Sequence, residues 1–170
     1  MFICKRNIPI VSIVNHPIIT GQEAFLVLTL QIASVHDLES LAQLYAELVD
    51  EQTDFCRMRE NFKLMESNPN YIVLTAKDDN LVVGSAMGVI CLDLVGKCIP
   101  FMVIENVVVK IAWRGKGIGA KLMGEIEGMG RKRKCYYTMF VSGSHRKDAH
   151  RFYESIGYDL ESVQGFKKYL

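Results

Sequence analysis

The sequence predicts a single α/β domain whose mixed, mostly antiparallel sheet is flanked by helices. The length of 170 residues and the 49% content of hydrophobic residues suit one domain with a sizeable core. Two amphipathic helical stretches follow one another in the first half of the chain, before an apolar hairpin pattern. In the second half, strands and helices alternate only briefly, which does not fit the steady alternation of a doubly wound fold.

The first half of the chain is expected to form one strand and two helices. Residues 24–33 are rich in aliphatic and β-branched side chains, which is typical of a strand. Residues 34–51 carry leucines at helical spacing behind Ser34, a suitable N-cap. A second helix over 54–66 has an apolar stripe formed by Phe55, Met58, Phe62 and Met65.

The remaining elements follow a change from helical to strand periodicity. Residues 71–76 and 81–92 flank the polar turn "KDDN" and predict an antiparallel hairpin. The further expected elements are a strand at 100–109, a helix at 117–130, a strand at 135–141, a helix at 145–157 and a last short strand at 165–170.

Residues 1–25 fall outside this pattern, and we expect an irregular N-terminal extension, with room for one strand, before a domain at 26–170. Neither a signal peptide nor a membrane span is predicted, because the early apolar run is broken by Pro9, Asn15 and Pro17. The five cysteines are scattered without a C-x-x-C pair, so we expect no disulfide framework and no metal site. These features favour a cytoplasmic protein.

The formal net charge of +1 hides an asymmetry along the chain. Residues 26–100 contain eleven acidic and five basic residues, a net charge of −6, whereas residues 101–170 contain seven acidic and thirteen basic residues, a net charge of +6. The C-terminal half therefore suits an anionic ligand and the N-terminal half a cationic one, although two differently solvated faces would give the same pattern.

The stretch "RGKGIG", residues 114–119, lies where a predicted strand gives way to a predicted helix. The first N–H groups of a helix lack partners within the helix and lie at the positive end of its dipole. Glycines allow a ligand to approach the backbone, and Arg114 adds a positive charge. The stretch predicts a cradle for a phosphate or pyrophosphate, and the alternative is a plain glycine-rich turn.

Two common nucleotide motifs do not fit this loop. The glycine spacing is G-x-G-x-G instead of the G-x-G-x-x-G of dinucleotide-binding folds, and the next strand is followed by "SGS" instead of an acidic residue. The pattern G-x-x-x-x-G-K-[ST] of phosphate-binding loops does not occur in the chain.

The loop instead resembles the [RQ]-x-x-G-x-[GA] acyl-CoA motif of the GNAT superfamily of N-acetyltransferases. A second stretch, residues 149–158, is similar to the superfamily's A-x-x-x-Y-x-x-x-G-[FY] segment. The matched positions are Arg114, Gly117 and Gly119 in the first motif and Ala149, Tyr153, Gly157 and Tyr158 in the second. The resemblance covers the chain from residue 26 onward. It implies the GNAT acyl-CoA N-acyltransferase fold, with a V-shaped split between the fourth and fifth strands.

The resemblance also implies acetyl-CoA as the co-substrate, without a metal ion. The strand at 100–109 would offer backbone groups to the pantetheine arm, and the glycine loop would surround the pyrophosphate. The residues expected at this site are Val107, Val108, Val109, Arg114, Gly115, Lys116, Gly117, Ile118, Gly119 and Ala120.

One position departs from the family pattern. Many members carry an Asn seven residues before the motif tyrosine, where it contacts the pantetheine, and here this position is Arg146. Because Arg donates hydrogen bonds but cannot accept them, either Ser142 or Ser144 takes this role, or Arg146 reaches a phosphate of CoA.

Two residues are candidates for the chemistry. By the resemblance, Tyr153 would protonate the departing thiolate. Glu105 is the only charged residue in the strand "FMVIENVVV", where a carboxylate is costly unless it is paired or reaches a cleft. Glu105 is therefore a candidate base or a structural carboxylate, and Tyr153 is otherwise a buried aromatic residue. Asn106 is expected to alternate to the opposite side of the strand, in a structural role.

The leading hypothesis is therefore transfer of acetyl from acetyl-CoA to a primary amine, either a small cationic molecule or a lysine or N-terminal amine. The acidic residues Asp50, Glu51 and Asp54 would lie near the acceptor. A non-catalytic acyl-CoA sensor is the alternative, and a nicotinamide-dependent oxidoreductase is disfavoured by the glycine spacing. Nucleic acid and membranes are not expected as partners, and a homodimer stays open because the sequence does not fix the oligomeric state.

Overall fold

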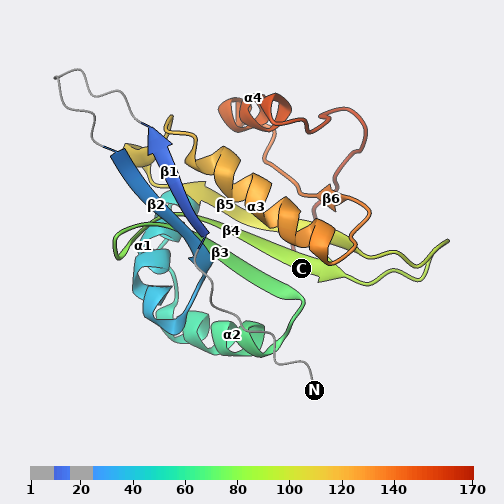
Figure 1. Cartoon of the computed structure of the whole chain (residues 1–170). Coiled ribbons are helices and arrows are strands. Elements are labelled where there is room, and N and C mark those ends of the chain that lie inside the picture. Colours follow the sequence, from blue (N-terminus) through green and yellow to red (C-terminus); the bar gives the residue numbers. More distant parts are fainter. Residues whose placement is uncertain (1–9, 16–24) are drawn as a thin grey trace.

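A computed structural model describes residues 10–15 and 25–170, which form one six-stranded sheet with helices on both faces (Figure 1). The strands lie in chain order, and every neighbouring pair is antiparallel except β5 and β6, which run parallel. This confirms the predicted mixed, mostly antiparallel sheet. The strands are β1 (Ile10–Asn15), β2 (Phe25–Ile32), β3 (Tyr71–Asp78), β4 (Leu81–Cys91), β5 (Phe101–Val109) and β6 (Thr138–Met139). The helices are η1 (Val35–Asp37), α1 (Leu38–Val49), α2 (Phe55–Ser67), η2 (Ile111–Trp113), α3 (Ile118–Lys132) and α4 (Lys147–Ser155).

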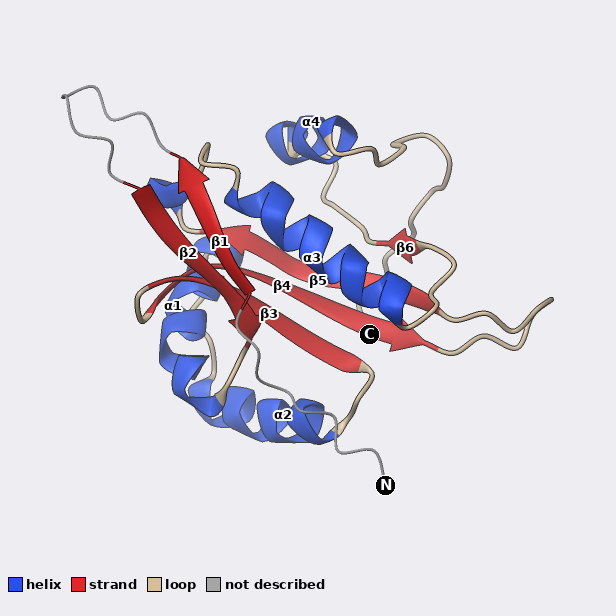
Figure 2. Cartoon of the chain, in the orientation of Figure 1, coloured by secondary structure: helices blue, strands red, loops and turns tan. Residues whose placement is uncertain are grey.

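The sheet separates two apolar clusters, one on each face. Helices α1 and α2 cover one face, and α3 and α4 lie on the other (Figure 2). Under α3 the buried side chains include Leu74, Met102, Ile104, Leu122, Met123 and Ile126. Under α1 and α2 they include Leu38, Leu41, Leu44, Phe62, Val82 and Val108. These positions follow the apolar periodicity of the sequence, so burial of the predicted stripes orients each helix.

The helix predicted over 34–51 begins with a capping turn. The backbone N–H of Ser34 donates to the carboxylate of Asp37 over 2.8 Å, and the Ser34 hydroxyl donates to the same oxygen. Asp37 is buried and also pairs with Lys77 of β3. The buried carboxylate is therefore compensated, and it fixes the start of α1 against the sheet.

Strand β1 lies within the region predicted as an N-terminal extension. It pairs antiparallel with β2, from Ile10 opposite Leu30 to Asn15 opposite Phe25. Residues 1–9 and 16–24 lie outside the described part of the chain, and the predicted boundary at residue 25 stays a prediction. Within the described ranges, no helix combines the length and apolar character that a membrane crossing requires.

Two predictions for the C-terminal region were wrong. The strand predicted over 135–141 is reduced to the two residues of β6. The strand predicted over 165–170 is absent from the described structure, although Gly165 lies beside Val141. Because β6 is so short, it offers little ladder for a further strand, and the apolar side chains of Phe166 and Tyr169 remain exposed.

Candidate active site

The edge of β5 that faces β6 is open over most of its length. The two strands pair only at Met102 opposite Thr138 and at Val103 opposite Met139. Among the described residues, 104–109 have no ladder partner on this edge. This divergence confirms the V-shaped split between the fourth and fifth strands of the predicted sheet, and it leaves backbone groups available to an extended ligand.

A β-bulge distorts β5 in the middle of this open edge. Glu105 lies opposite Met87 and Val108 lies opposite Ser85, so Asn106 and Val107 together face one residue of β4. Asn106 has a φ of 54°, in the left-handed region that asparagine tolerates better than most residues. The predicted alternation at Asn106 was therefore wrong, because the bulge interrupts it. An asparagine within an otherwise valine-rich strand was the signal that could have indicated the bulge.

The three predicted valines of β5 divide between the two faces of the sheet. Val108 is buried in the cluster under α1, whereas Val107 and Val109 pack partly buried toward the cluster under α3. The backbone at the open edge is thus held by side chains on both faces.

The chain after β5 is held by two side-chain contacts. Arg114 Nε donates to the carbonyl of Val109 over 3.0 Å, and the backbone N–H of Ile111 donates to Glu47 Oε2 over 2.9 Å. Glu47 comes from α1, on the other side of the split, and sequence reasoning did not identify it. Lys116 lies over the ring of Trp113, with Nζ 4.6 Å from the ring centroid. These contacts hold the segment between β5 and α3 in place. They also keep the cationic side chains of Arg114 and Lys116 close to the glycine loop.

The three glycines of the loop have different roles. Gly115 and Gly117 have φ values of 74° and 73°, and a Cβ on either would meet no atom within 4 Å. Gly119 instead packs against α4, where a Cβ would lie 3.1 Å from Cζ of Phe152. Ile118 is buried and Ala120 is exposed. The glycines therefore serve the turn and the helix packing as well as access to the backbone.

The N-terminus of α3 can bind an anion. Its N-cap is Gly117, which provides no side-chain cap for the first N–H groups of the helix. Unpaired N–H groups at the positive end of a helix dipole, beside Arg114 and Lys116, match the chemistry of a phosphate group.

The ring of Tyr153 in α4 is buried in the cluster under α3. The residue is 6% exposed, and its ring centroid lies 4.3 Å from that of Phe140. Burial raises the pKa of Tyr153 above its ordinary value, the guanidinium of Arg146 lowers it, and the carboxylate of Glu105 raises it. No hydrogen bond to the Tyr153 hydroxyl is found among the described residues, and its oxygen is not enclosed as that of Ser142 is. A protonated hydroxyl with no partner in the protein is a suitable proton donor to a ligand.

Glu105 lies on the side of the sheet that α1 and α2 cover. Residues directly opposite one another in neighbouring strands project to the same face, and Glu105 is opposite Met87, which lines a cavity on that face. Its carboxylate is half-buried and close enough to influence the pKa of Tyr153. Glu105 and Tyr153 therefore lie near one another but on opposite faces of the sheet, at β5, the strand that borders the split.

The loop before α4 contains Arg146, which departs from the family pattern, and Ser142, which is expected to replace the missing asparagine. Arg146 is the N-cap of α4 and is exposed. Ser142 Oγ is enclosed, and among the described residues it is the one buried side-chain oxygen or nitrogen without a hydrogen-bond partner. A buried hydroxyl is costly when it is unpaired, so Ser142 is available to pair with a bound ligand.

A cavity of about 300 Å³ opens between α1, α2 and the sheet. It includes Asn106 of the bulge and Met87 of β4, so it adjoins Glu105. Of the predicted acidic acceptor residues, Asp54 lines this cavity, where it also caps α2 by accepting from the N–H of Arg57; Asp50 and Glu51 are exposed outside its lining. The remaining lining residues are Leu38, Leu41, Tyr45, Thr53, Arg57, Met58, Asn61, Phe62, Met65 and Val73.

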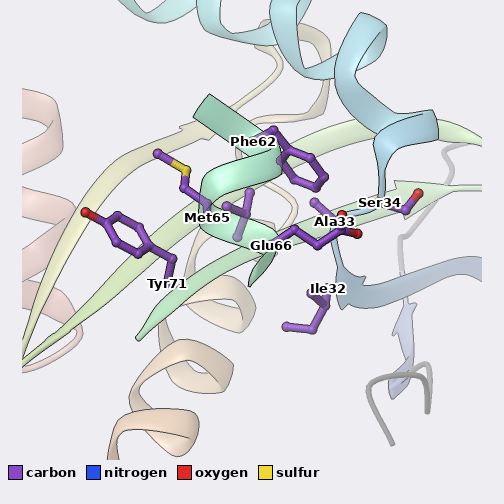
Figure 3. Close-up of a pocket in the computed structure, with 8 residues that line it drawn as sticks. Ile32, Ala33, Ser34, Phe62, Met65, Glu66 and Tyr71 are labelled. Atoms are coloured by element: carbon purple, nitrogen blue, oxygen red, sulfur yellow. The ribbon is translucent and has the colours of Figure 1, made fainter. Parts of the chain in front are cut away.

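A smaller cavity of about 160 Å³ adjoins the first one. Figure 3 shows the residues that line this space, which include Phe62 and Met65 of α2 and Ile32 at the end of β2. The two cavities share Phe62, Met65 and Val73. Side chains at the contact between α2 and β3 therefore separate the two spaces.

These features together define an acyl-CoA-dependent transferase fold. The chain belongs to the acetyltransferase (GNAT) family, whose sequence model matches residues 33–158. It is similar to the aminoalkylphosphonate N-acetyltransferase of Salmonella typhimurium, with 27% identity over 140 residues that span 76% of this chain and 83% of the relative. The protein is an acetyl-CoA-dependent N-acetyltransferase.

Solved structures agree on the fold. A transcriptional regulator from Bacillus halodurans superposes with a TM-score of 0.79 and 25% identity, over 84% of this chain and 99% of the other. An aminoglycoside N-acetyltransferase in complex with CoA superposes with a TM-score of 0.71 and 17% identity, over 83% and 94% of the two chains. This chain therefore shares its fold with a protein whose structure contains bound CoA.

Proposed function

We propose that this protein transfers the acetyl group of acetyl-CoA to the primary amine of a small molecule. The observation that carries the proposal is the position of Tyr153 and Glu105 beside the open edge of β5, which leads directly into the loop at 114–119. The cavity next to Glu105, of about 300 Å³, has the size of a small-molecule site. The relationship to an aminoalkylphosphonate N-acetyltransferase supports the same class of acceptor.

In this proposal, backbone groups of Val107, Val108 and Val109 pair with the pantetheine arm, and Ser142 contributes its unpaired hydroxyl. The loop from Arg114 to Ala120 surrounds the pyrophosphate, using the first N–H groups of α3 and the charges of Arg114 and Lys116. Arg146 is available to a phosphate of CoA. The protein acts in the cytoplasm in this account.

The chemistry requires three proton transfers: two protons leave the amine nitrogen and one reaches the sulfur. An ammonium group of pKa about 10 is almost wholly protonated at neutral pH, so Glu105 accepts a proton from the amine directly or through a water molecule. The amine nitrogen then attacks the thioester carbonyl carbon, and the carbon–sulfur bond breaks. Tyr153 donates its hydroxyl proton to the sulfur, and the nitrogen loses its second proton, which restores the Tyr153 hydroxyl. The products are the N-acetylated amine and CoA.

The Tyr153→Phe variant tests this assignment. We expect kcat to fall by about 10²-fold, because the thiolate loses its proton donor, while the affinity for acetyl-CoA changes little. The measurement is release of the CoA thiol with a primary amine at saturating acetyl-CoA.

The matched control is Tyr158→Phe. Tyr158 contacts the same aromatic group, but its hydroxyl is paired with Thr138 and Glu127 at 2.9 and 3.0 Å. We expect this variant to lose stability and keep a kcat within about twofold of the wild type. An equal kcat in Tyr153→Phe and the wild type would remove Tyr153 from the chemistry.

A further inference from the structure

The floor of the larger cavity includes Val73 and Met87, which form a row across the sheet that continues to Glu105 beside the cavity. Val73 of β3 lies opposite Met87 of β4, and Met87 lies opposite Glu105 of β5. The three side chains therefore project to the same face, toward α2. Neighbouring strands are about 4.8 Å apart, so the row spans roughly 10 Å, with two apolar residues followed by the carboxylate.

Helix α2 covers this row with apolar side chains. Met58, Phe62 and Met65 line the cavity at helical spacing, and Phe62 is 8% exposed. Methionine side chains are flexible and adapt to ligands of different shape. The cavity thus has an apolar floor and an apolar roof.

The polar groups of the inner wall are already paired within the protein. The Tyr45 hydroxyl hydrogen-bonds Ser85 Oγ over 3.1 Å, and Ser85 Oγ donates to the carbonyl of Leu74. Thr53 Oγ1 donates to the carbonyl of Ala42, and Asp54 caps α2. The exposed lining residues lie at the solvent side: Asp54, Arg57, Asn61 and Asn106.

We propose that the acceptor is a primary amine with an apolar alkyl or aryl body, which lies along Val73 and Met87 and presents its amine to Glu105. This inference rests on the proposed function, because it specifies the acceptor of that reaction. Burying an apolar body against Met58, Met65 and Met87 removes apolar surface from water, whereas a charged body would lose hydration without gaining a buried partner.

The lining also lacks the charge that a highly charged acceptor would need. Asp54 and Arg57 are the charged residues of the lining, and their formal charges cancel. The additional charges of a polyamine or a dianionic amine therefore find no excess of opposite charge in the lining. The carboxylate of Glu105 pairs only with the reacting amine.

The first test compares amines at saturating acetyl-CoA, by thiol release. Hexylamine and 2-phenylethylamine represent apolar bodies, 2-aminoethylphosphonate an anionic one and spermidine a cationic one. We expect kcat/KM for the two apolar amines to exceed that for the polar amines by at least about tenfold, the discrimination that burial of a few methylene groups provides. Equal values, or a preference for either polar amine, would overturn the proposal.

The second test changes the floor of the cavity. Met87→Gln keeps the length of the side chain but introduces a polar group, and we expect a loss of about tenfold or more in kcat/KM for hexylamine, with unchanged acetyl-CoA affinity. The control is Leu64→Gln, since Leu64 belongs to α2 but is 69% exposed and lies outside the cavity lining. If Met87→Gln behaved as Leu64→Gln does, Met87 would not contact the acceptor.

A readout without turnover separates this proposal from the proposed function. Protein labelled at its methionine methyl groups gives NMR signals for Met58, Met65 and Met87, which Met→Leu variants assign. Hexylamine should shift these three signals, and 2-aminoethylphosphonate should not. The reverse result, or no shift with hexylamine, would overturn the proposal even if acetyl-CoA binds. Absence of acetyl-CoA binding would instead contradict the proposed function. The NMR signals would then still show whether the cavity binds an apolar amine.

Discussion

Tyr153 illustrates how one side chain serves both packing and chemistry. Its ring contacts Phe140, Phe152 and Tyr158, so the position would be held by an aromatic residue even without catalysis. The hydroxyl is different, because it has no partner in the described structure and its pKa is affected by Arg146 and Glu105. The sequence motif predicted the residue, but its orientation toward Glu105 depends on the split between two strands that are distant in the chain.

The raised pKa of Tyr153 leads to a prediction on pH dependence. An ordinary tyrosine has a pKa of about 10, and burial shifts the value of Tyr153 upward. Its hydroxyl therefore stays protonated as pH rises toward 10, and kcat should not fall over pH 7 to about 9.5 through loss of this proton. The measurement is kcat against pH in buffers of constant ionic strength. A decline centred below pH 9 that disappears in Tyr153→Phe would contradict the assignment.

At the scale of elements, the bulge in β5 depends on the conformation of Asn106. A β-branched residue in the left-handed region costs about 1–3 kcal/mol, whereas glycine adopts this conformation freely. We expect Asn106→Val to lower the free energy of unfolding by about this amount and to raise KM for acetyl-CoA. Asn106→Gly should keep both close to wild-type values. Denaturant unfolding and steady-state kinetics measure the two effects, and similar behaviour of both variants would show that the φ of Asn106 is unimportant.

The docking of α3 on β4 is the second element on which the site depends. A Cβ at Gly84 would lie 2.9 Å from Leu122 Cδ1 and 3.3 Å from the backbone oxygen of Val108. Gly84→Ala should therefore displace α3 and destabilise the protein by about 1–3 kcal/mol. Gly124, on the exposed side of α3, has no atom within 4 Å of an added Cβ, and Gly124→Ala should stabilise the protein by about 0.5–1 kcal/mol. Thermal unfolding compares the two, and an equal effect would contradict the packing described for Gly84.

The elements show which parts of the fold could be predicted from the sequence. The helices at 34–51, 54–66, 117–130 and 145–157 were predicted to within a few residues, because each has an apolar stripe that must be buried. The two-residue β6 and the absence of a strand at 165–170 could not be predicted, and the asparagine within a valine-rich strand was the one signal for the bulge at Asn106. These features depend on pairing between distant segments, and periodicity within one segment contains no information on the length of its partner.

At the scale of the whole molecule, the charge asymmetry of the sequence corresponds to the two sides of the sheet. The basic C-terminal half supplies α3, α4 and the glycine loop, and the acidic N-terminal half supplies α1 and α2. Binding of an anion on the basic side stays a prediction. On the acidic side, Asp50 and Glu51 are exposed outside the cavity and its lining is mainly apolar, so the sequence did not predict the character of this cavity. Net charge describes a surface, whereas the cavity depends on which side chains turn inward.

Calorimetric titration with acetyl-CoA, with NADH as the control, tests the central claim that the loop at 114–119 and the open edge of β5 bind acetyl-CoA. We predict saturable one-site binding of acetyl-CoA and no binding of NADH. We also predict weaker binding of acetyl-CoA to Arg114→Gln and at higher salt, because the contact with the pyrophosphate is electrostatic. Absence of acetyl-CoA binding to folded protein, or equal binding of NADH, would contradict this assignment.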